Sequence, residues 1–237
     1  MDNIDNINFG NEPNNNETLS TESEKTQNRN ETRIDVHDIS EARAKREGSR
    51  YIAEELSKVL TSIVADDENI EKTTKISEEL AEAYKAGKKS LIAGNGGSNC
   101  DAMHFAEEFT GRFRSDRPAL PSISISDSSH ITCVGNDFGF NFVFAKGVEA
   151  FGQEGDFFFG ISTSGNSQNV IEAVKAAKKK GLKTVALLGK DGGKLKGVCD
   201  YEFIIPGKTS DRIQEVHMMI LHIIIEGVER ILFPENY

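Results

Sequence analysis

An alternation of short apolar runs with helical patterns, from about residue 90 to residue 232, is the feature that most constrains how this chain folds. Five runs are short and bounded by turn residues, which is typical of buried strands. They cover residues 90–93, 122–126, 156–161, 183–188 and 201–205. Four helical patterns follow strands. The first ends near residue 111, the second covers residues 140–151, the third continues through residue 180 and the fourth covers residues 210–232. Strands that alternate with helices over short loops pair in parallel, so the pattern predicts an α/β fold with helices on both faces of a parallel sheet.

The chain before the first predicted strand divides into two parts. Residues 1–35 are rich in Asn, Glu, Thr and Ser and contain few apolar side chains. Such a segment buries too little surface to offset the entropy of ordering. We therefore predict a disordered polar extension over residues 1–35 and one domain over residues 36–237.

Two helices are expected at the start of that domain. In the first, one apolar stripe recurs at helical spacing and consists of Ile52, Leu56, Val59, Leu60 and Ile63. A polar break at residues 66–68 precedes a second helix, which ends near Gly87. The pattern predicts a helical hairpin whose apolar faces pack against the following domain or against another subunit.

Composition argues against several classes of function. The formal net charge is -10, whereas proteins that mainly bind nucleic acid cluster Lys and Arg. A small anionic ligand is still possible, because it feels the local field of its pocket. The three cysteines form no Cys-x-x-Cys pair, so we expect reduced thiols in a cytoplasmic protein. No apolar run approaches the ~20 residues of a membrane span, and we expect no membrane partner.

Two loops that follow predicted strands are suited to hold a phosphate. The first contains Asn95, Gly96, Gly97 and Ser98, where glycines allow the backbone to approach a ligand closely. The second leads into a helix N-terminus, where free N–H groups and the helix dipole attract an anion. A tight turn with a serine cap would also explain one such loop. However, four hydroxyls within six residues exceed what capping requires; they belong to Ser162, Thr163, Ser164 and Ser167.

Two predicted helices carry polar groups suited to catalysis. His104 and Glu108 are four residues apart on one helix face, which suits metal ligands, an acid/base pair or an ordinary solvated helix. The last helix places polar residues among apolar ones: Asp211, Gln214, His217 and His222. The simplest interpretation of His222 is a histidine buried in the core, with its hydrogen bonds made and no role in catalysis. An isomerase that moves a proton between C1 and C2 needs a carboxylate base, a second proton carrier and an electrophile such as a divalent metal.

Longer motifs extend this hypothesis. Gly-Asn-Gly-Gly-Ser at residues 94–98, Asp-Ala-Met-His-Phe-Ala-Glu-Glu at 101–108 and Gly-Ile-Ser-Thr-Ser-Gly-Asn-Ser at 160–167 closely resemble the phosphoheptose isomerase family. So do the segments at residues 125–127, 129–130, 133–139, 189–193 and 211–215. The resemblance covers roughly residues 52–231, and several motifs in the right order make it specific.

The resemblance implies a fold, an assembly and a reaction. The fold would be the sugar isomerase (SIS) fold, a three-layer αβα sandwich with a five-stranded parallel sheet. The family forms homotetramers with the N-terminal helices at subunit interfaces. It interconverts D-sedoheptulose 7-phosphate and D-glycero-D-manno-heptose 7-phosphate through an enediol, for the activated heptose of bacterial lipopolysaccharide or capsule. The alternative that we weigh is a non-catalytic sugar-phosphate-binding or replication-initiator-associated protein on the same fold.

The resemblance also implies roles for residues. Glu108 would be the catalytic base and His222 its acid/base partner. One zinc ion per subunit would be held by His104, Glu108, Gln214 and His222, with His217 as an alternative ligand. Since a metal lowers the pKa of a bound carboxylate, the ligand and base roles of Glu108 compete. Substrate would contact thirteen residues: Asn95, Gly96, Gly97, Ser98, Glu108, Asn136, Asp137, Ser162, Thr163, Ser164, Ser167, Asp211 and Gln214.

Overall fold

A computed structural model describes residues 36–237 of the protein. The extension predicted for residues 1–35 lies outside the described residues. The chain divides into two units, Met1–Ala44 and Lys45–Tyr237. The second unit contains every strand described below.

Five parallel strands form one sheet, as the alternating pattern predicts. They are β1 (Ser90–Gly94), β2 (Ser122–Ser124), β3 (Phe157–Ser162), β4 (Lys183–Gly189) and β5 (Tyr201–Ile205). The order across the sheet is β2-β1-β3-β4-β5, and every neighbouring pair is parallel. The direction of winding reverses between β1 and β3, and ligands of open α/β sheets bind at the carboxyl ends of the strands beside such a reversal.

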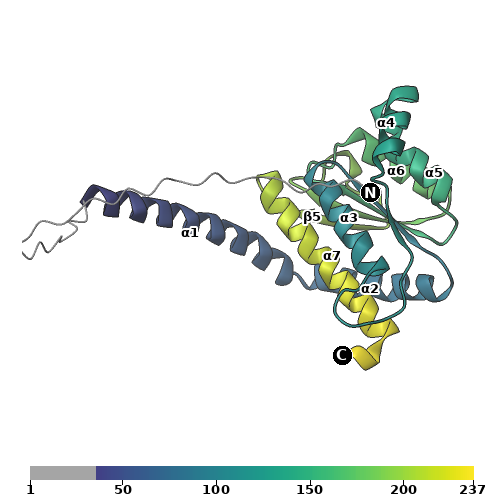
Figure 1. The fold of residues 1–237 in the computed structure, drawn as a ribbon, viewed down its shortest axis with the longest axis horizontal. Coiled ribbons are helices and arrows are strands. Elements are labelled where there is room, and N and C mark those ends of the chain that lie inside the picture. Colours follow the sequence, from purple (N-terminus) through teal and green to yellow (C-terminus); the bar gives the residue numbers. More distant parts are fainter. Residues whose placement is uncertain (1–35) are drawn as a thin grey trace, which may run out of the picture. The chain divides into compact units, whose positions relative to one another are not determined.

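Within residues 36–237, seven α-helices precede, connect and follow the strands (Figure 1). They are α1 (Val36–Val64), α2 (Asp67–Lys85), α3 (Gly97–Thr110), α4 (Ser128–Asp137), α5 (Val143–Phe151), α6 (Gln168–Lys179) and α7 (Ser210–Leu232). Side chains alternate between the two faces of the sheet. Ile92 and Phe159 join a core with α2, α3 and α7, whereas Leu91 and Phe158 join a second core with α5 and α6. The αβα sandwich expected from the sequence is therefore confirmed.

The break between α1 and α2 and the end of α2 lie where the sequence indicates. Asp66, in the polar break, caps α2 by accepting a hydrogen bond from the Glu68 N–H at 3.1 Å. Gly87, with a positive φ of 73°, lies just past the end of α2. The apolar face of α2 packs against α7, so the following domain provides its partner.

One helix, α4, lies where the sequence pattern favours a loop. Asp127 caps it by accepting a hydrogen bond from the His130 N–H at 2.8 Å. Val134 is its one buried residue, so α4 lacks the apolar stripe by which helices are recognised. The helix expected over residues 140–151 begins as a 3₁₀ turn, Phe140–Phe142, and becomes α5 only at Val143.

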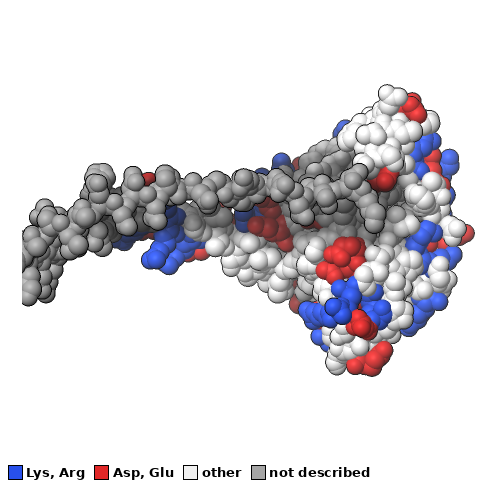
Figure 2. Space-filling view, viewed as in Figure 1, with Lys and Arg blue, Asp and Glu red and all other residues white. Residues whose placement is uncertain are grey.

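Charge is mixed on the face of the domain that Figure 2 shows. On the face shown in Figure 2, acidic and basic side chains are interspersed over the domain, and several form local ion pairs such as Lys175–Glu172 at 2.9 Å. None of the helices within residues 36–237 combines the length and hydropathy needed to cross a membrane. All three cysteines are free thiols.

Candidate active site

The loop after β1 brings its backbone to the switch point of the sheet. Gly96 has a φ of 57° and precedes α3, whose first turn has no side-chain cap. A Cβ on Gly97 would lie 2.6 Å from the end of the Gln214 side chain, so a larger residue there would displace this amide. The uncapped N-terminus of α3 thus faces α7 directly.

The loop after β3 turns its hydroxyls toward one another. Ser162 Oγ donates to Ser167 Oγ at 3.0 Å, and Thr163 Oγ1 is 3.2 Å from Ser210 Oγ at the start of α7. Ser167 is the N-cap residue of α6, yet its side chain makes no capping bond. Ser164 Oγ accepts from the Asn166 N–H at 3.2 Å. Capping therefore does not account for these serines, and the uncapped start of α6 adds free N–H groups to the loop.

A pair of amides joins the two loops. Asn95 and Asn169 exchange reciprocal hydrogen bonds of 2.9 and 2.8 Å between the β1–α3 loop and the start of α6. Beside them is a cavity of about 170 Å³, lined by Asn95, Gly96, Asn99 and residues of α4 and α5. The Oδ1 atom of Asn99 is buried without a hydrogen-bond partner. A buried acceptor of this kind needs a donor, which a substrate hydroxyl or a water would provide.

Three of the predicted chemical groups meet between α3 and α7. His104 Nε2 lies 3.1 Å from His222 Nε2 and 3.3 Å from Glu108 Oε1. One ligand atom from each residue falls within 4.8 Å of the others. We call His104, Glu108 and His222 the triad. The interpretation of His222 as an ordinary core histidine is wrong, because the ring is half-buried and faces these two groups.

The surroundings of the triad shift two pKa values. Burial raises the pKa of Glu108, and the neighbouring Glu107 carboxylate raises it further. Burial lowers the pKa of His222, and the charges of His104 and Arg114 lower it further. A raised carboxyl pKa makes a stronger base, and a neutral imidazole keeps a free lone pair.

Gln214 and Asp211 lie nearer to the loops than to the triad. Gln214 Nε2 donates to Ser98 Oγ at 3.2 Å. Ser98 lies about one and two-thirds helical turns before His104 in α3. Asp211 is at the start of α7, where hydrogen bonds from Thr209 and Arg212 lower its pKa to about 2. Its carboxylate therefore stays ionised beside the loop after β3.

Three other predicted residues lie away from the triad. Asn136 and Asp137 are exposed at the end of α4, where the Asn136 amide donates to Asp137 Oδ1 at 2.8 Å. His217 is fully buried, and its Nε2 donates to the Leu188 carbonyl at 2.9 Å. Burial lowers the pKa of His217 to about 4. His217 therefore serves the core, in contrast to its suggested role as an alternative metal ligand.

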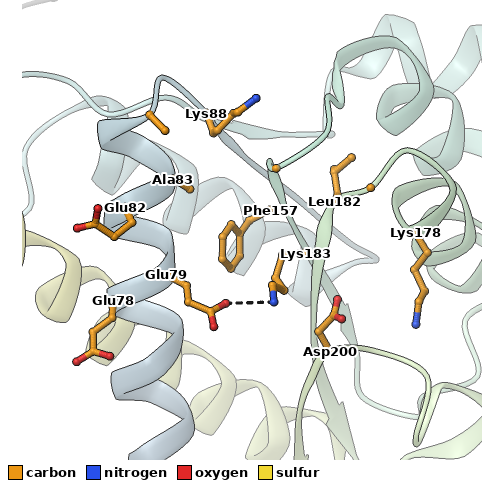
Figure 3. A pocket seen from close by; sticks show the side chains of 13 residues that line it. Glu78, Glu79, Glu82, Ala83, Lys88, Phe157, Lys178, Leu182, Lys183 and Asp200 are labelled. Carbon is orange, nitrogen blue, oxygen red and sulfur yellow. Dashed lines mark ion pairs between the residues drawn. The ribbon is translucent and has the colours of Figure 1, made fainter.

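A cavity of about 730 Å³ lies at the opposite edge of the sheet (Figure 3). It is formed at the amino ends of β3 and β4, where Phe157 and Lys183 begin these strands. Glu79 and Lys183, on facing walls, form an ion pair of 3.4 Å. Because ligands of such sheets bind at the carboxyl edge, we assign the chemistry to the smaller cavity and the triad.

Sequence patterns missed residues that support the site. Asn169 is 3% exposed and holds Asn95, but nothing in the sequence marks it as different from other polar residues at a helix start. Phe113, in the loop after α3, lies with its ring centroid 5.8 Å from that of His222. Such contacts depend on how the loop folds back, which no periodic pattern records.

The fold and the paired loops define an α/β domain that binds phosphorylated sugars, and comparisons with known proteins agree. The family model described as "SIS domain" matches residues 50–189. A phosphoheptose isomerase of Fusobacterium nucleatum is 72% identical over 179 residues, which are 76% of this chain and 92% of the relative. One from Escherichia fergusonii is 54% identical over 177 residues, covering 74% and 92%.

A solved structure gives the same result. The phosphoheptose isomerase of Neisseria gonorrhoeae superimposes with a TM-score of 0.70 at 36% identity, covering 78% of this chain and 99% of that one. The chain belongs to the SIS-domain family and, within it, to the phosphoheptose isomerases. It is an isomerase, and the non-catalytic alternative is not favoured.

Proposed function

We propose that this enzyme interconverts D-sedoheptulose 7-phosphate and D-glycero-D-manno-heptose 7-phosphate. The observation that carries the proposal is the triad, which brings a carboxylate and two imidazoles together about two helical turns along α3 from the loop after β1. Gly97 precedes His104 by seven residues of α3, about 10 Å at 1.5 Å per residue. A seven-carbon chain that ends in a phosphate is long enough to bridge this distance.

The loops hold the substrate without using a lysine. The phosphate is bound by the hydroxyls of Ser162, Thr163, Ser164 and Ser167 and by the free N–H groups at the start of α6. Asn95, Gly96, Gly97 and Ser98 contribute backbone and amide donors from the neighbouring loop. Asn136, Asp137, Asp211 and Gln214 bind sugar hydroxyls, and Asp211 acts as an ionised acceptor.

Glu108 and His222 move the protons. Glu108 removes a proton from C1 of the ketose and returns it to C2, and the enediol is the intermediate between these steps. Burial raises the pKa of Glu108, which makes its carboxylate a stronger base for this removal. His222, whose pKa is lowered by burial, carries the proton between the C1 and C2 oxygens. The same two groups serve the reverse direction.

The donor set of the triad fits a zinc ion. Tetrahedral zinc with ligands at about 2.0–2.1 Å would need ligand atoms about 3.3 Å apart. Two pairs of the triad lie 3.1 and 3.3 Å apart, and the Glu108–His222 pair lies within 4.8 Å. His104, Glu108 and His222 would hold one ion per subunit, and the ion would then lower the pKa of Glu108, so that its ligand and base roles compete. Gln214 would complete the set only by leaving Ser98. When bound, zinc supplies Lewis acidity to the oxygens of the enediol.

A homotetramer is proposed on the exposed apolar surface of α1. Tyr51 and Ile52 are 59% and 53% exposed. A groove of about 490 Å³ beside Leu56 and Leu60 also exposes His222. A second subunit that covers this groove would close the active site from one side, as expected for sites at subunit boundaries. The N-terminal helices would thus serve oligomerisation.

The product fits a cytoplasmic role in making nucleotide-activated heptose for bacterial surface polysaccharide, either lipopolysaccharide core or capsule. The free thiols and mixed surface charge are consistent with this location. A small sugar phosphate is the partner, with no role for nucleic acid.

One experiment tests this proposal. Purified protein is incubated with sedoheptulose 7-phosphate, with and without a zinc chelator, and the aldose is followed by chromatography. We expect the aldose to form and the chelator to reduce its rate. A ketose that remains unchanged under both conditions would contradict the proposal and favour a non-catalytic sugar-phosphate-binding protein.

A further inference from the structure

The α3–β2 loop, residues 111–121, links the helix of Glu108 to the sheet and also contacts α7. Three residues of this loop contact three residues of α7, and the contacts follow the same order along both segments. The three α7 residues, His222, Glu226 and Glu229, are spaced four and three positions apart, so they lie on one face of the helix. The contacts are Phe113 with the His222 ring, Arg114 with Glu226 at 2.8 Å and Arg117 with Glu229 at 2.6 Å. The loop therefore follows the face of α7 that carries the catalytic histidine.

Arg117 is the buried centre of this contact. Its side chain is 1% exposed. Its Nη2 atom donates to the Glu108 carbonyl at 2.5 Å, and its Nη1 atom donates to the carbonyls of Phe109 and Gly111 at 2.7 and 3.0 Å. The last carbonyls of a helix have no partner within the helix, and a cation there also opposes the helix dipole. Arg117 thus holds the backbone of Glu108 itself.

Glu229 completes the arrangement from the other helix. Its side chain is 2% exposed and accepts from Arg117 Nε at 2.6 Å and from the Tyr237 hydroxyl at 3.0 Å. A buried charge needs such partners, since desolvation is costly. The ion pair therefore fastens the end of α3 to α7. On α3 the contact lies within about one turn after Glu108, and on α7 it lies about two turns after His222.

We propose that Arg117 and Glu229 are positioning residues, which hold Glu108 at the distance from His222 that the triad requires. This inference rests on the proposed function, because it assigns these residues to the same site. Neither side chain lines the substrate cavity, and the two charges act on the pKa of Glu108 in opposite directions. Catalytic groups need placement to within about 0.5 Å, and a guanidinium with several partners gives that rigidity better than one flexible ion pair.

The test compares four variants with the parent protein. They are Arg117→Met, Glu229→Gln, the double variant and Arg117→Lys. A control replaces a partly exposed ion pair on α6, Lys175→Met with Glu172→Gln. Each protein is measured for thermal midpoint, zinc affinity by chelator competition, kcat and KM.

We expect stability and function to separate. Arg117→Met or Glu229→Gln alone leaves the charge of the other residue buried without its ionic partner, so the thermal midpoint falls. The double variant removes both charges and regains much of the lost midpoint. Zinc affinity and kcat should stay about 10–100-fold lower in the double variant, as for lost supports of metal ligands. KM should change little, because the phosphate loops are intact. Arg117→Lys should give intermediate values, and the control should match the parent.

Two results would overturn the inference. One is a double variant whose zinc affinity and kcat return to parent values together with its midpoint. The other is an Arg117→Lys variant with losses as large as those of the double variant. If Arg117→Met does not fold, the double and Lys variants decide. A parent protein without isomerase activity would refute the proposed function instead, and zinc affinity would still test the positioning.

Discussion

Gly165, in the loop after β3, should be the glycine whose replacement by alanine is most informative. Its φ is 63°, a region that costs a residue with a Cβ about 1–2 kcal/mol. An added Cβ would also lie only 1.8 Å from the Gly192 carbonyl oxygen, which is backbone and must move. Overpacking of this kind costs a further ~1–3 kcal/mol. Gly165→Ala should therefore lose about 2–5 kcal/mol of unfolding free energy.

A matched control separates the two contributions. Gly87 has a similar φ of 73°, but a Cβ there meets nothing within 4 Å. Gly87→Ala should lose only about 1–2 kcal/mol. For a protein of this size, each kcal/mol shifts the thermal midpoint by about 2–4 °C. The expected falls are thus about 2–8 °C for Gly87→Ala and about 4–20 °C for Gly165→Ala.

The assay also measures phosphate binding, as inhibition of the isomerase by inorganic phosphate. Displacement of the loop in Gly165→Ala should weaken inhibition at least about tenfold, the usual cost of one lost charge-assisted hydrogen bond, while zinc affinity stays at the parent value. Equal midpoints for the two alanine variants, with unchanged phosphate inhibition, would refute the reasoning about this loop.

Two further predictions concern the helices. Glu108→Gln should lower kcat about 10²–10⁴-fold, the usual contribution of a general base, with the oligomeric state unchanged on a sizing column; full activity would contradict its role as base. Burial lowers the pKa of His217 to about 4 in the folded protein, so below pH 6.5 only the unfolded state takes up this proton, and unfolding free energy should fall by about 3 kcal/mol from pH 6.5 to pH 4. Urea titrations should show that this dependence is reduced in His217→Gln, and an equal dependence in both proteins would exclude His217 as its source.

Much of the fold could be predicted because it follows from periodicity. Strands β4 and β5 and helix α7 lie where their apolar patterns indicate, since each buries a regular face. Helix α4 could not be predicted in this way, because it depends on the Asp127 cap and buries only Val134. Local capping without an amphipathic pattern leaves little trace in a sequence.

The site shows the same division. His104 and Glu108 share a helix face by spacing alone, whereas His222 joins them from 118 positions along the chain. Their meeting was expected from the family resemblance rather than from spacing. Arg117 and Glu229 were not predicted at all, because a buried pair between a loop and a distant helix turn has no periodic signal. Polar side chains are placed by tertiary packing, and so they are the hardest part to infer.

The most direct test of the account is to follow deuterium during isomerisation in heavy water. Proton transfer by Glu108, which exchanges with solvent, should place deuterium on C2 of the aldose, detected by nuclear magnetic resonance, and Glu108→Gln should incorporate none above background. A Glu108→Gln variant that forms the aldose at the parent rate, with as much deuterium at C2 as the parent gives, would contradict the central claim, because another group would then move the proton.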